Sequence, residues 1–426
     1  MEIPKKVKKI FCPVHGFMEV RPYLFKIIDT YEFQRLRNLK QLGAAHHVFP
    51  SATHTRFAHS LAVSHLARKM IESIKKNQPY LNINERDIEL VEIGALIHDL
   101  GHGPYSHLWD NYVISHDDDE HEERSCKIFE IMIKVYNLNI SDEEFKKICQ
   151  IINPTLSETK HNWYYQIVAN KRSQLDVDKI DYIQRDSFHL GNMGLNGNFD
   201  RLITEARVIT TKEGTMELGW HHRLNYEIFS LFSTRFKLHK LVYTHHAVKA
   251  HEYLLLDALK RKYEELKKGA IRFIDLTDNC ITDTSEMRKM ENHRRIVDRN
   301  LPVMVGESIV VKNHQNSMEL NKDFHIIHTH HTYPLRILNI LIDKVHIAFS
   351  GEDENPMNKV FYYKTADCSK ETIYGYEIYP TWCSTEFNEI ILRCYIMNGS
   401  KSTDIEDHKK DALTFWNRYK EELNLK

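Results

Sequence analysis

The 426-residue chain lacks several features that would place it in a specialised class of protein. It has no apolar run long enough to span a bilayer and no signal peptide, so we expect neither membrane insertion nor secretion. Its seven cysteines are scattered and include no CxxC pair, which predicts free thiols in a reducing compartment. Its formal net charge is −1, so no overall field attracts nucleic acid or an anionic membrane. These absences predict a cytoplasmic protein without a membrane partner, with the nucleus as the alternative location.

Apolar residues at helical spacing dominate the first two thirds of the chain. One predicted helix is capped by Asn84 and ends at Gly101 as its C′ glycine, and another covers residues 224–268. Further along, short β-like runs alternate with turns. We therefore expect a mainly α fold, with a helical domain over residues 1–270 and a smaller mixed α+β lobe over residues 271–426.

Histidine is the residue type that stands out, with 27 copies that cluster mainly around residues 46–121 and 221–251. One stretch, residues 95–107, holds three histidines and an aspartate within ten residues; it begins as an apolar helix end and finishes as a turn rich in glycine and proline. Ionisable groups in such a place are costly to bury unless they are paired or bound to a metal. On a continuous helix, His98 and His102 would share one face, which suits a ligand and its partner. This stretch is our candidate for the active site.

A His-Asp dipeptide alone is a weak signal, and the chain has two of them. His116-Asp117 lies in an acidic loop, where solvated side chains are the simpler interpretation. His98-Asp99 sits at a predicted helix end, and a mononuclear metal site there needs further ligands from other helices, for which His59 and Asp178 are candidates. Imidazole and carboxylate together suit Zn, Fe, Mn or Mg. The alternative is a buried hydrogen-bonded polar network without a metal.

The order His59, His98-Asp99, Asp178 resembles the H…HD…D motif of the HD-superfamily metal phosphohydrolases. Over about residues 10–305 the chain also resembles, more narrowly, the SAM-and-HD-domain deoxynucleoside triphosphate (dNTP) triphosphohydrolases. The resemblance implies an HD-domain helical bundle with its metal core at about residues 54–186. Because the chain starts directly at the catalytic region, we expect no SAM domain. The stretches that carry this narrower resemblance are Phe33–Arg37, Lys40–Gly43, Thr55–Phe57, His98–His107, Asp176–Asp186 and Thr234–Tyr243.

The resemblance implies a reaction. Water attacks the α-phosphate of a dNTP, and deoxynucleoside and inorganic triphosphate leave, with Mg bound to the nucleotide. The leaving 5′-oxygen needs a proton, which a histidine near neutral pKa is suited to give. By resemblance His107 is that acid, Asp110 tunes it, and His102 and His121 complete the histidine cluster. The implied ligands of one divalent or transition metal are His59, His98, Asp99 and Asp178.

The resemblance also implies a nucleotide-binding set. Guanidinium and ammonium groups would bind the triphosphate, two tyrosines would exclude a 2′-hydroxyl, and a carboxylate would bind the 3′-hydroxyl. Arg235, His239 and Tyr243 lie at i, i+4 and i+8, so a single helix would present all three on one face. The alternative interpretation of this spacing is a stripe of solvent-exposed side chains without a binding role. The phosphate-binding candidates are Arg56, Lys179 and Arg235; the sugar-facing and base-facing candidates are Tyr182, Tyr243, Asp186, His239, Gln41 and Leu42.

Family members are activated by guanine nucleotides and deoxynucleotides that bind between subunits and assemble a tetramer. At the entry strand, Phe11-Cys12 replaces the family's asparagine and aspartate, and Val303 replaces a lysine. We therefore expect a guanine nucleotide site, with GTP as activator, and a weakened or absent deoxynucleotide site in a homo-oligomer, either dimer or tetramer. The positions that match the family's guanine and distal phosphate contacts are Asp29, Gln34, Arg37, Arg207 and Arg299.

Two other functions stay open at this point. One is an HD-type phosphodiesterase or nuclease, against which Lys179, Tyr182 and Asp186 match nucleotide-binding positions rather than metal ligands alone. The other is a non-catalytic nucleotide-binding or nucleic-acid-binding protein, against which the near-zero net charge offers no broad phosphate-binding face.

Overall fold

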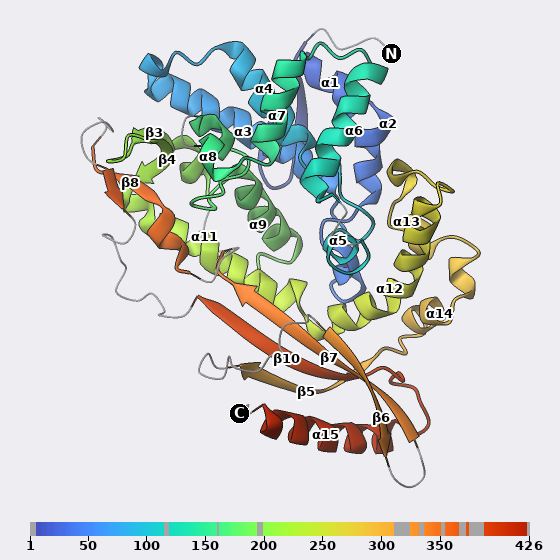
Figure 1. Ribbon diagram of the computed structural model, residues 1–426. Coiled ribbons are helices and arrows are strands. Elements are labelled where there is room, and N and C mark those ends of the chain that lie inside the picture. Colours follow the sequence, from blue (N-terminus) through green and yellow to red (C-terminus); the bar gives the residue numbers. More distant parts are fainter. Residues whose placement is uncertain are drawn as a thin grey trace.

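The computed structural model describes residues 6–114, 119–159, 162–193, 199–310, 324–331, 336–350, 354–365, 372–374 and 387–423. Helices form most of this part of the chain, and its longest strands lie in the last third (Figure 1). The predicted mainly α fold is therefore confirmed. None of the described helices is long and apolar enough to cross a membrane. The dipeptide His116-Asp117 lies outside the described residues.

Most of the described helices lie in the first two thirds of the chain (Figure 1). In chain order the described α-helices are α1 (Pro22–Ile28), α2 (Tyr31–Gln34), α3 (Arg56–Asn77), α4 (Glu85–Ile97), α5 (His107–Tyr112), α6 (His121–Val135), α7 (Asp142–Ile152), α8 (Leu156–Thr159), α9 (Val177–His189), α10 (Asp200–Thr204), α11 (Asn225–Leu238), α12 (His246–Lys267), α13 (Asn279–Thr282), α14 (Glu291–Val297) and α15 (Ile405–Glu422).

The described strands form one hairpin and two four-stranded sheets. The hairpin pairs β1 with β2, the larger sheet has the antiparallel order β5-β10-β7-β6, and the smaller has the order β3-β4-β8-β9. The strands are β1 (Lys8–Cys12), β2 (Gly16–Val20), β3 (Arg207–Thr210), β4 (Met216–His221), β5 (Val303–Val310), β6 (Phe324–His331), β7 (Arg336–Ala348), β8 (Phe361–Tyr363), β9 (Thr372–Tyr374) and β10 (Asn388–Ile396).

Helix α3 lies at the centre of the helical body, where it packs against α4 and α9, while α4 packs against α7. Side-chain caps fix where two of these neighbours begin. The Asn84 side chain accepts the backbone N–H of Asp87 at the start of α4, and Asp176 accepts that of Lys179 at the start of α9. The start of α3, the end of α4 and the start of α9 thereby supply the candidate metal ligands.

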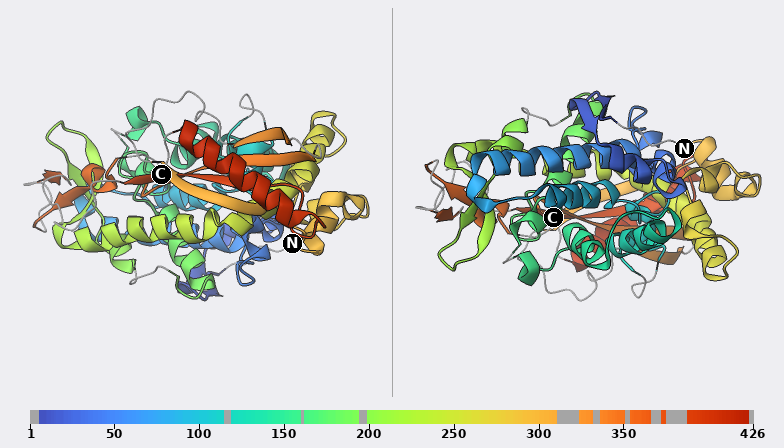
Figure 2. Two further views of the ribbon diagram at one scale, coloured as in Figure 1. Left: turned by 90° about the horizontal axis from the view of Figure 1, so that it is seen from below. Right: turned by 90° about the horizontal axis from the view of Figure 1, so that it is seen from above.

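The larger sheet separates helix α15 from the rest of the molecule (Figures 1 and 2). Phe415 and Trp416 of α15 are buried in an apolar core on one face of this sheet. A Cβ at Gly306 of β5 would lie 2.2 Å from Nε1 of Trp416, so the absence of a side chain lets the indole lie on the strand. The sheet also contacts the helical body, through a 2.7 Å ion pair between Lys240 and Glu389. The larger sheet is thus joined to the helical body.

The prediction that Gly101 is a C′ glycine is wrong. Helix α4 ends at Ile97, and Gly101 is absent from the glycines with positive φ. A Cβ at Gly101 would instead lie 2.0 Å from the carbonyl oxygen of His121, so glycine is needed because the first turn of α6 packs directly against this backbone. The left-handed residues of the turn are Tyr105 and Ser106, with φ of 58° and 55°. His98 and His102 consequently do not share a helix face.

A single helix over residues 224–268 is also wrong. Helix α11 ends at Leu238, a π-helical turn covers His239–Tyr243, and α12 begins at His246. The wider π turn brings the rings of His239 and Tyr243 to 4.8 Å between centroids. These two side chains are in contact within a π turn, and not at the regular i, i+4 spacing of an α-helix.

The division into domains at residue 270 stays a prediction. Strand β8, from the later part of the chain, pairs in parallel with β4 from the earlier part, so the smaller sheet draws strands from both sides of that position.

Candidate active site

Three side chains from three helices meet at one point. His59 lies in the first turns of α3, His98 directly follows α4, and Asp178 lies in the first turn of α9. One donor atom from each falls within 4.8 Å of the other two, with Nε2 of His59 at 2.9 Å and Nε2 of His98 at 3.5 Å from Oδ1 of Asp178. This is the spacing that a divalent cation with imidazole and carboxylate ligands requires.

The orientation of both imidazoles suits a cation. Nδ1 of His98 lies 2.8 Å from the carbonyl oxygen of Ala95, to which it donates, while its buried Nε2 has no hydrogen-bond partner in the described part of the chain. Nδ1 of His59 lies 2.7 Å from Oδ2 of Asp181. In the neutral form of each ring the proton therefore lies on Nδ1, and Nε2 is the nitrogen available to a metal. The residues present fit a divalent metal.

The carboxylates dominate the electrostatics of this cluster. Burial alone would lower the pKa of His59, but hydrogen bonds with Asp178 and Asp181 outweigh burial and raise the pKa to about 10. Burial would likewise raise the pKa of Asp178, but His59 and His98 hold it well below its usual range. A cluster that attracts a proton this strongly without a metal is equally suited to attract a cation.

Asp99 lies beside this cluster and also contacts a second one. Its Oδ1 is 3.4 Å from Nε2 of His98 and 3.3 Å from Nε2 of His102. Its Oδ2 is 2.6 Å from Nη1 of Arg56, whose Nε donates to Ser106 at 2.8 Å. One carboxylate thus joins the candidate metal ligands, a histidine cluster and a candidate phosphate-binding arginine.

The second cluster is built from the turn after α4 and from helices α5 and α6. The rings of His102 and His121 are stacked at 4.0 Å, and the ring of His107 stands edge-on to His102 at 5.5 Å. Oδ2 of Asp110 is 3.3 Å from Nδ1 of His102, and Arg124 donates to the other oxygen of Asp110. The predicted catalytic residues are therefore brought together.

His107 differs from its neighbours because its side chain is exposed. Partial desolvation by surrounding protein, together with the charges of His102 and Arg56, lowers the pKa of His107 below its usual value. An anion bound next to this ring would oppose the effect of those positive charges and raise the pKa of His107.

Four of the predicted nucleotide-binding residues form a connected group on α9, α11 and the π turn. Oδ2 of Asp186 accepts the Tyr243 hydroxyl at 2.5 Å, and Oδ1 of Asp186 lies 2.7 Å from Nε2 of His54. Nε of Arg235 donates to the Tyr182 hydroxyl at 3.1 Å. Tyr182 and Tyr243 also influence each other electrostatically, so the two pairs are close together.

The remaining candidates lie around this group. Nζ of Lys179 is 3.5 Å from Oδ2 of Asp176. The buried Oε1 of Gln41 makes no hydrogen bond within the described residues, and Leu42 is half-buried. His239 packs on Tyr243, and burial together with the charges of Arg235 and His107 lowers its pKa.

The predicted regulatory residues fall into separate places. Nε of Arg37 donates to Oε1 of Gln34 at 2.7 Å, and its guanidinium lies 3.5 Å from the ring centre of Phe57. Asp29 ends α1, one residue before α2 is capped. Arg207 begins β3 and Arg299 follows α14, and these two elements lie at opposite ends of the molecule (Figures 1 and 2).

Several contacts at the site were not foreseen from the sequence. Asp181 orients His59, His54 binds Asp186, and Nη1 of Arg235 donates to the carbonyl oxygens of Ala348 and Ser350 in the C-terminal lobe, at 2.6 and 3.1 Å. Asp181 follows Asp178 by three residues on α9, which is the only local signal that could have singled it out.

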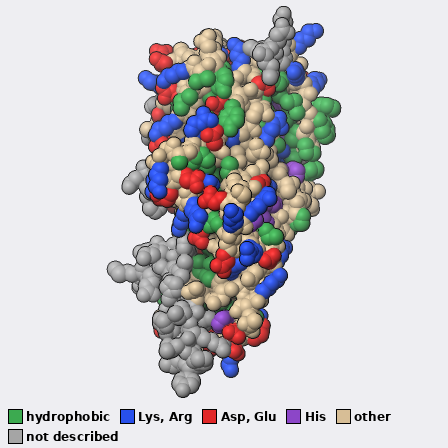
Figure 3. Space-filling model, turned by 90° about the vertical axis from the view of Figure 1, so that its right-hand side faces the viewer, with side chains coloured by type: hydrophobic (Ala, Val, Ile, Leu, Met, Phe, Trp, Pro, Cys, Tyr) green, Lys and Arg blue, Asp and Glu red, His purple; other side chains and the backbone are tan. Residues whose placement is uncertain are grey.

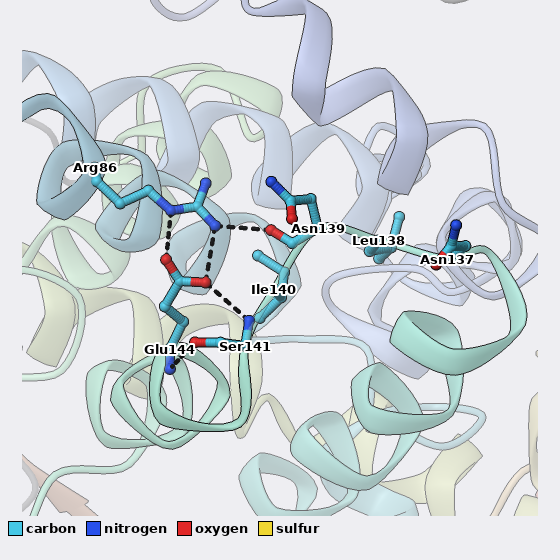
Figure 4. A pocket seen from close by; sticks show the side chains of 7 residues that line it. All are labelled: Arg86, Asn137, Leu138, Asn139, Ile140, Ser141 and Glu144. Atoms are coloured by element: carbon cyan, nitrogen blue, oxygen red, sulfur yellow. Dashed lines mark hydrogen bonds and ion pairs between the residues drawn. The ribbon is translucent and has the colours of Figure 1, made fainter.

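A hollow of about 580 Å³ lies away from these clusters, at the start of α7 (Figure 4). Arg86 pairs there with Glu144 at 2.6 Å, and Ser141 and Glu144 form the capping box of α7. The Arg86 side chain also donates to the carbonyl oxygen of Asn139. These contacts fix the loop that precedes α7, and the hollow holds no candidate catalytic group.

The family model described as HD domain matches residues 56–186, the segment that supplies His59, His98, Asp99 and Asp178. The fold and the site therefore define an HD-domain protein. The chain is 33% identical over 419 residues to the deoxynucleoside triphosphate triphosphohydrolase SAMHD1 homolog of Dictyostelium discoideum, covering 94% of this chain and 80% of that protein. It is 32% identical to deoxynucleoside triphosphate triphosphohydrolase SAMHD1 of Bos taurus, covering 94% and 77%, and 38% identical over 299 residues to the putative HD domain-containing protein L394 of Acanthamoeba polyphaga mimivirus, covering 65% and 64%. The chain belongs to the SAMHD1 family, as the motifs in its sequence predicted.

Proposed function

We propose that this protein is a metal-dependent dNTP triphosphohydrolase that cleaves a dNTP into deoxynucleoside and inorganic triphosphate. The observation that carries the proposal is the position of Asp99, which joins a three-residue cation site to a histidine cluster. Family membership supports the same activity, because the relatives from Dictyostelium discoideum and Bos taurus are named deoxynucleoside triphosphate triphosphohydrolases.

The candidate ligands are His59, His98, Asp99 and Asp178, and the metal is Zn, Fe, Mn or Mg. When bound there, such a metal supplies Lewis acidity toward a phosphoryl oxygen and toward water. A separate Mg accompanies the triphosphate. Arg56, Lys179 and Arg235 bind the triphosphate.

The reaction breaks the bond between the α-phosphorus and the 5′-oxygen, while the oxygen of water bonds to the α-phosphorus. His107 donates a proton to the departing 5′-oxygen, and its low pKa in the free protein rises when the polyanionic substrate lies beside it. Asp110, His102 and His121 hold and replenish that proton. The contacts of Asp110 with His102 and Arg124 support this arrangement.

The sugar lies against the group formed by Asp186, Tyr182 and Tyr243. Asp186 accepts the 3′-hydroxyl, and the tyrosine rings occupy the space that a 2′-hydroxyl needs. Gln41 and Leu42 lie beside the sugar and base, and the ring of His239 packs against Tyr243. A pocket that contacts mainly sugar and phosphates accepts all four bases.

GTP binding between copies of the chain is the regulatory part of the proposal. Its guanine lies at Asp29, Gln34 and Arg37. Because β3 and α14 are at opposite ends of the molecule, one nucleotide near both Arg207 and Arg299 needs more than one copy of the chain. This supports a homo-oligomer.

Nucleic acid is a less suitable substrate, because the formal net charge of the chain is −1. On the face that carries α13 and α14, lysine and arginine side chains alternate with aspartate and glutamate (Figure 3). Phosphate-backbone binding needs a surface on which positive charge dominates.

The proposal is tested by incubating purified protein with each dNTP and Mn²⁺ or Mg²⁺, with and without GTP, and separating the products. The control is His293→Ala, which changes a histidine of α14 that belongs to neither cluster. We expect deoxynucleoside and triphosphate from the wild type and from this control, and neither from His98→Ala or Asp99→Ala. Monophosphate with pyrophosphate would contradict the proposed bond cleavage.

A further inference from the structure

The turn of the N-terminal hairpin reaches a carboxylate directly behind the candidate metal ligands. His15 lies between β1 and β2, and its Nε2 is 2.5 Å from Oδ1 of Asp181. The side chains of His15 and Asp181 are 5% and 0% exposed, so solvent does not compete for this hydrogen bond. The hairpin stands out from the helical body beside α3 (Figure 2).

Asp181 is shared among three partners. Its Oδ2 is 2.7 Å from Nδ1 of His59, and its two oxygens accept Nε and Nη2 of Arg185, both at 2.9 Å. The bidentate pair with Arg185 keeps the carboxylate ionised and fixes its plane. The hydrogen bond from His15 fixes the position of Oδ1 of this carboxylate.

The hairpin holds this pair at two points. Besides the contact of His15 with Asp181, Sγ of Cys12 at the end of β1 accepts Nη2 of Arg185 at 3.5 Å. His15 in the turn and Cys12 at the end of β1 thus both contact the Asp181–Arg185 pair.

The direction of these hydrogen bonds determines what they do to His59. Because Nδ1 of His59 donates to Asp181, the proton of the neutral ring lies on Nδ1, and Nε2 is left free toward Asp178. A carboxylate that holds a ligating histidine in this way sets its tautomer and its ring orientation. If Asp181 rotated, His59 would lose both.

We propose that His15 is a positioning residue for the metal centre: through Asp181 it holds His59 in the orientation and tautomer that bind the cation. The proposal rests on the metal site of the proposed function, but not on the identity of the nucleotide substrate. It makes the hairpin, which lies outside the segment matched as an HD domain, part of the support of the metal site.

The test measures Mn²⁺ affinity rather than turnover. Free Mn²⁺ is followed by electron paramagnetic resonance during titration of metal-free protein. His15→Gln keeps an N–H donor at the same number of bonds from the backbone, whereas in His15→Asn the amide nitrogen stops one bond short of Asp181. Loss of such a support of a metal ligand typically costs ten- to a hundredfold in metal affinity, so we expect about that loss for His15→Asn and less than about threefold for His15→Gln.

Two controls separate positioning from folding. His65→Asn changes a histidine of α3 that lies close to the hairpin without contacting Asp181, and its Mn²⁺ affinity should equal that of the wild type. The melting temperature of each metal-free variant reports the structural effect. The inference is overturned if both His15 variants bind Mn²⁺ like the wild type, or if both lose affinity only in proportion to a lower melting temperature of the metal-free protein.

The Mn²⁺ titration and the hydrolysis assay can fail independently of each other. A wild type that binds Mn²⁺ and shows the difference between His15→Gln and His15→Asn, but releases no triphosphate from any dNTP, would contradict the proposed activity and support this inference. Full dNTP hydrolysis combined with equal Mn²⁺ affinity in all variants would do the reverse.

Discussion

Asp99 and Arg56 form a buried ion pair, with Oδ2 of the carboxylate 2.6 Å from Nη1 of the guanidinium. The two side chains are 5% and 3% exposed, so removal of either leaves a charge that water cannot solvate. The pair ties a candidate metal ligand to a candidate phosphate-binding residue. A substrate phosphate that binds Arg56 would therefore change the ion pair of Asp99.

Arg56→Gln should lower both stability and activity. We expect a loss of about 3–5 kcal/mol in the free energy of unfolding, because Asp99 stays buried without its partner. The value of kcat/KM for a dNTP should fall at least about a hundredfold, since the phosphate contact disappears as well. Urea denaturation and initial rates measure the two effects.

Arg68→Gln on the same helix is the matched control. Arg68 lies nine residues after His59 on α3 and pairs with the buried Glu92 at 3.0 Å. This variant should lose stability but keep the kcat of the wild type in the fraction that remains folded. If Arg56→Gln loses no more activity than Arg68→Gln, the phosphate-binding role of Arg56 is wrong.

The pH dependence of turnover follows from the lowered pKa of His107. A general acid acts in its protonated form, and a pKa below its usual value means that this form accumulates only as the pH falls. We expect kcat/KM to rise from pH 8 toward pH 6 and the rise to vanish in His107→Gln, in rates measured at saturating metal. A wild type and a variant with parallel pH profiles would exclude His107 as the acid.

Asp186→Asn should discriminate between substrates by their 3′-position. The carboxylate binds the Tyr243 hydroxyl at 2.5 Å and, in our proposal, exchanges that partner for the 3′-hydroxyl of the sugar. The variant should lose about ten- to a hundredfold in kcat/KM for a dNTP, but much less for the 2′,3′-dideoxy analogue, whose missing hydroxyl cannot report the change. Equal losses for both substrates would show that Asp186 acts only on the protein itself.

GTP should raise both the hydrolysis rate and the molecular mass of the protein in solution. Arg37→Ala removes a guanidinium held by Gln34 and Phe57, and should abolish the response to GTP while leaving the basal rate unchanged. Rates and light scattering at increasing GTP measure the two responses. A wild type that does not respond to GTP would contradict the regulatory part of the proposal.

The sequence predicted the mainly α fold because apolar spacing and side-chain caps are local signals: Asn84 caps its helix as expected. The order of His59, His98 and Asp178 along the chain likewise predicted that the three would meet, because the motif resembled that of a known family. What the sequence could not show are contacts between distant segments. His15 and Asp181 are 166 residues apart, and Arg235 binds the carbonyl of Ala348, 113 residues away, so no periodic pattern connects either pair.

Gly101 illustrates a different limit. A glycine after a helix is typical of a C′ position, but here the neighbour that requires it is the backbone of α6, at His121. The residue type was informative, whereas the reason for it depended on packing. The π turn at His239–Tyr243 is similar, since nothing in its composition marks it against the helical pattern on either side.

The most direct test of the central claim is hydrolysis of a dNTP in water enriched in ¹⁸O, with the products examined by ³¹P nuclear magnetic resonance. Attack on the α-phosphate predicts one ¹⁸O on a terminal phosphorus of the triphosphate and an unlabelled 5′-hydroxyl on the deoxynucleoside. Label in released monophosphate or pyrophosphate, or in the deoxynucleoside, would mean that a different bond is cleaved and would contradict the account.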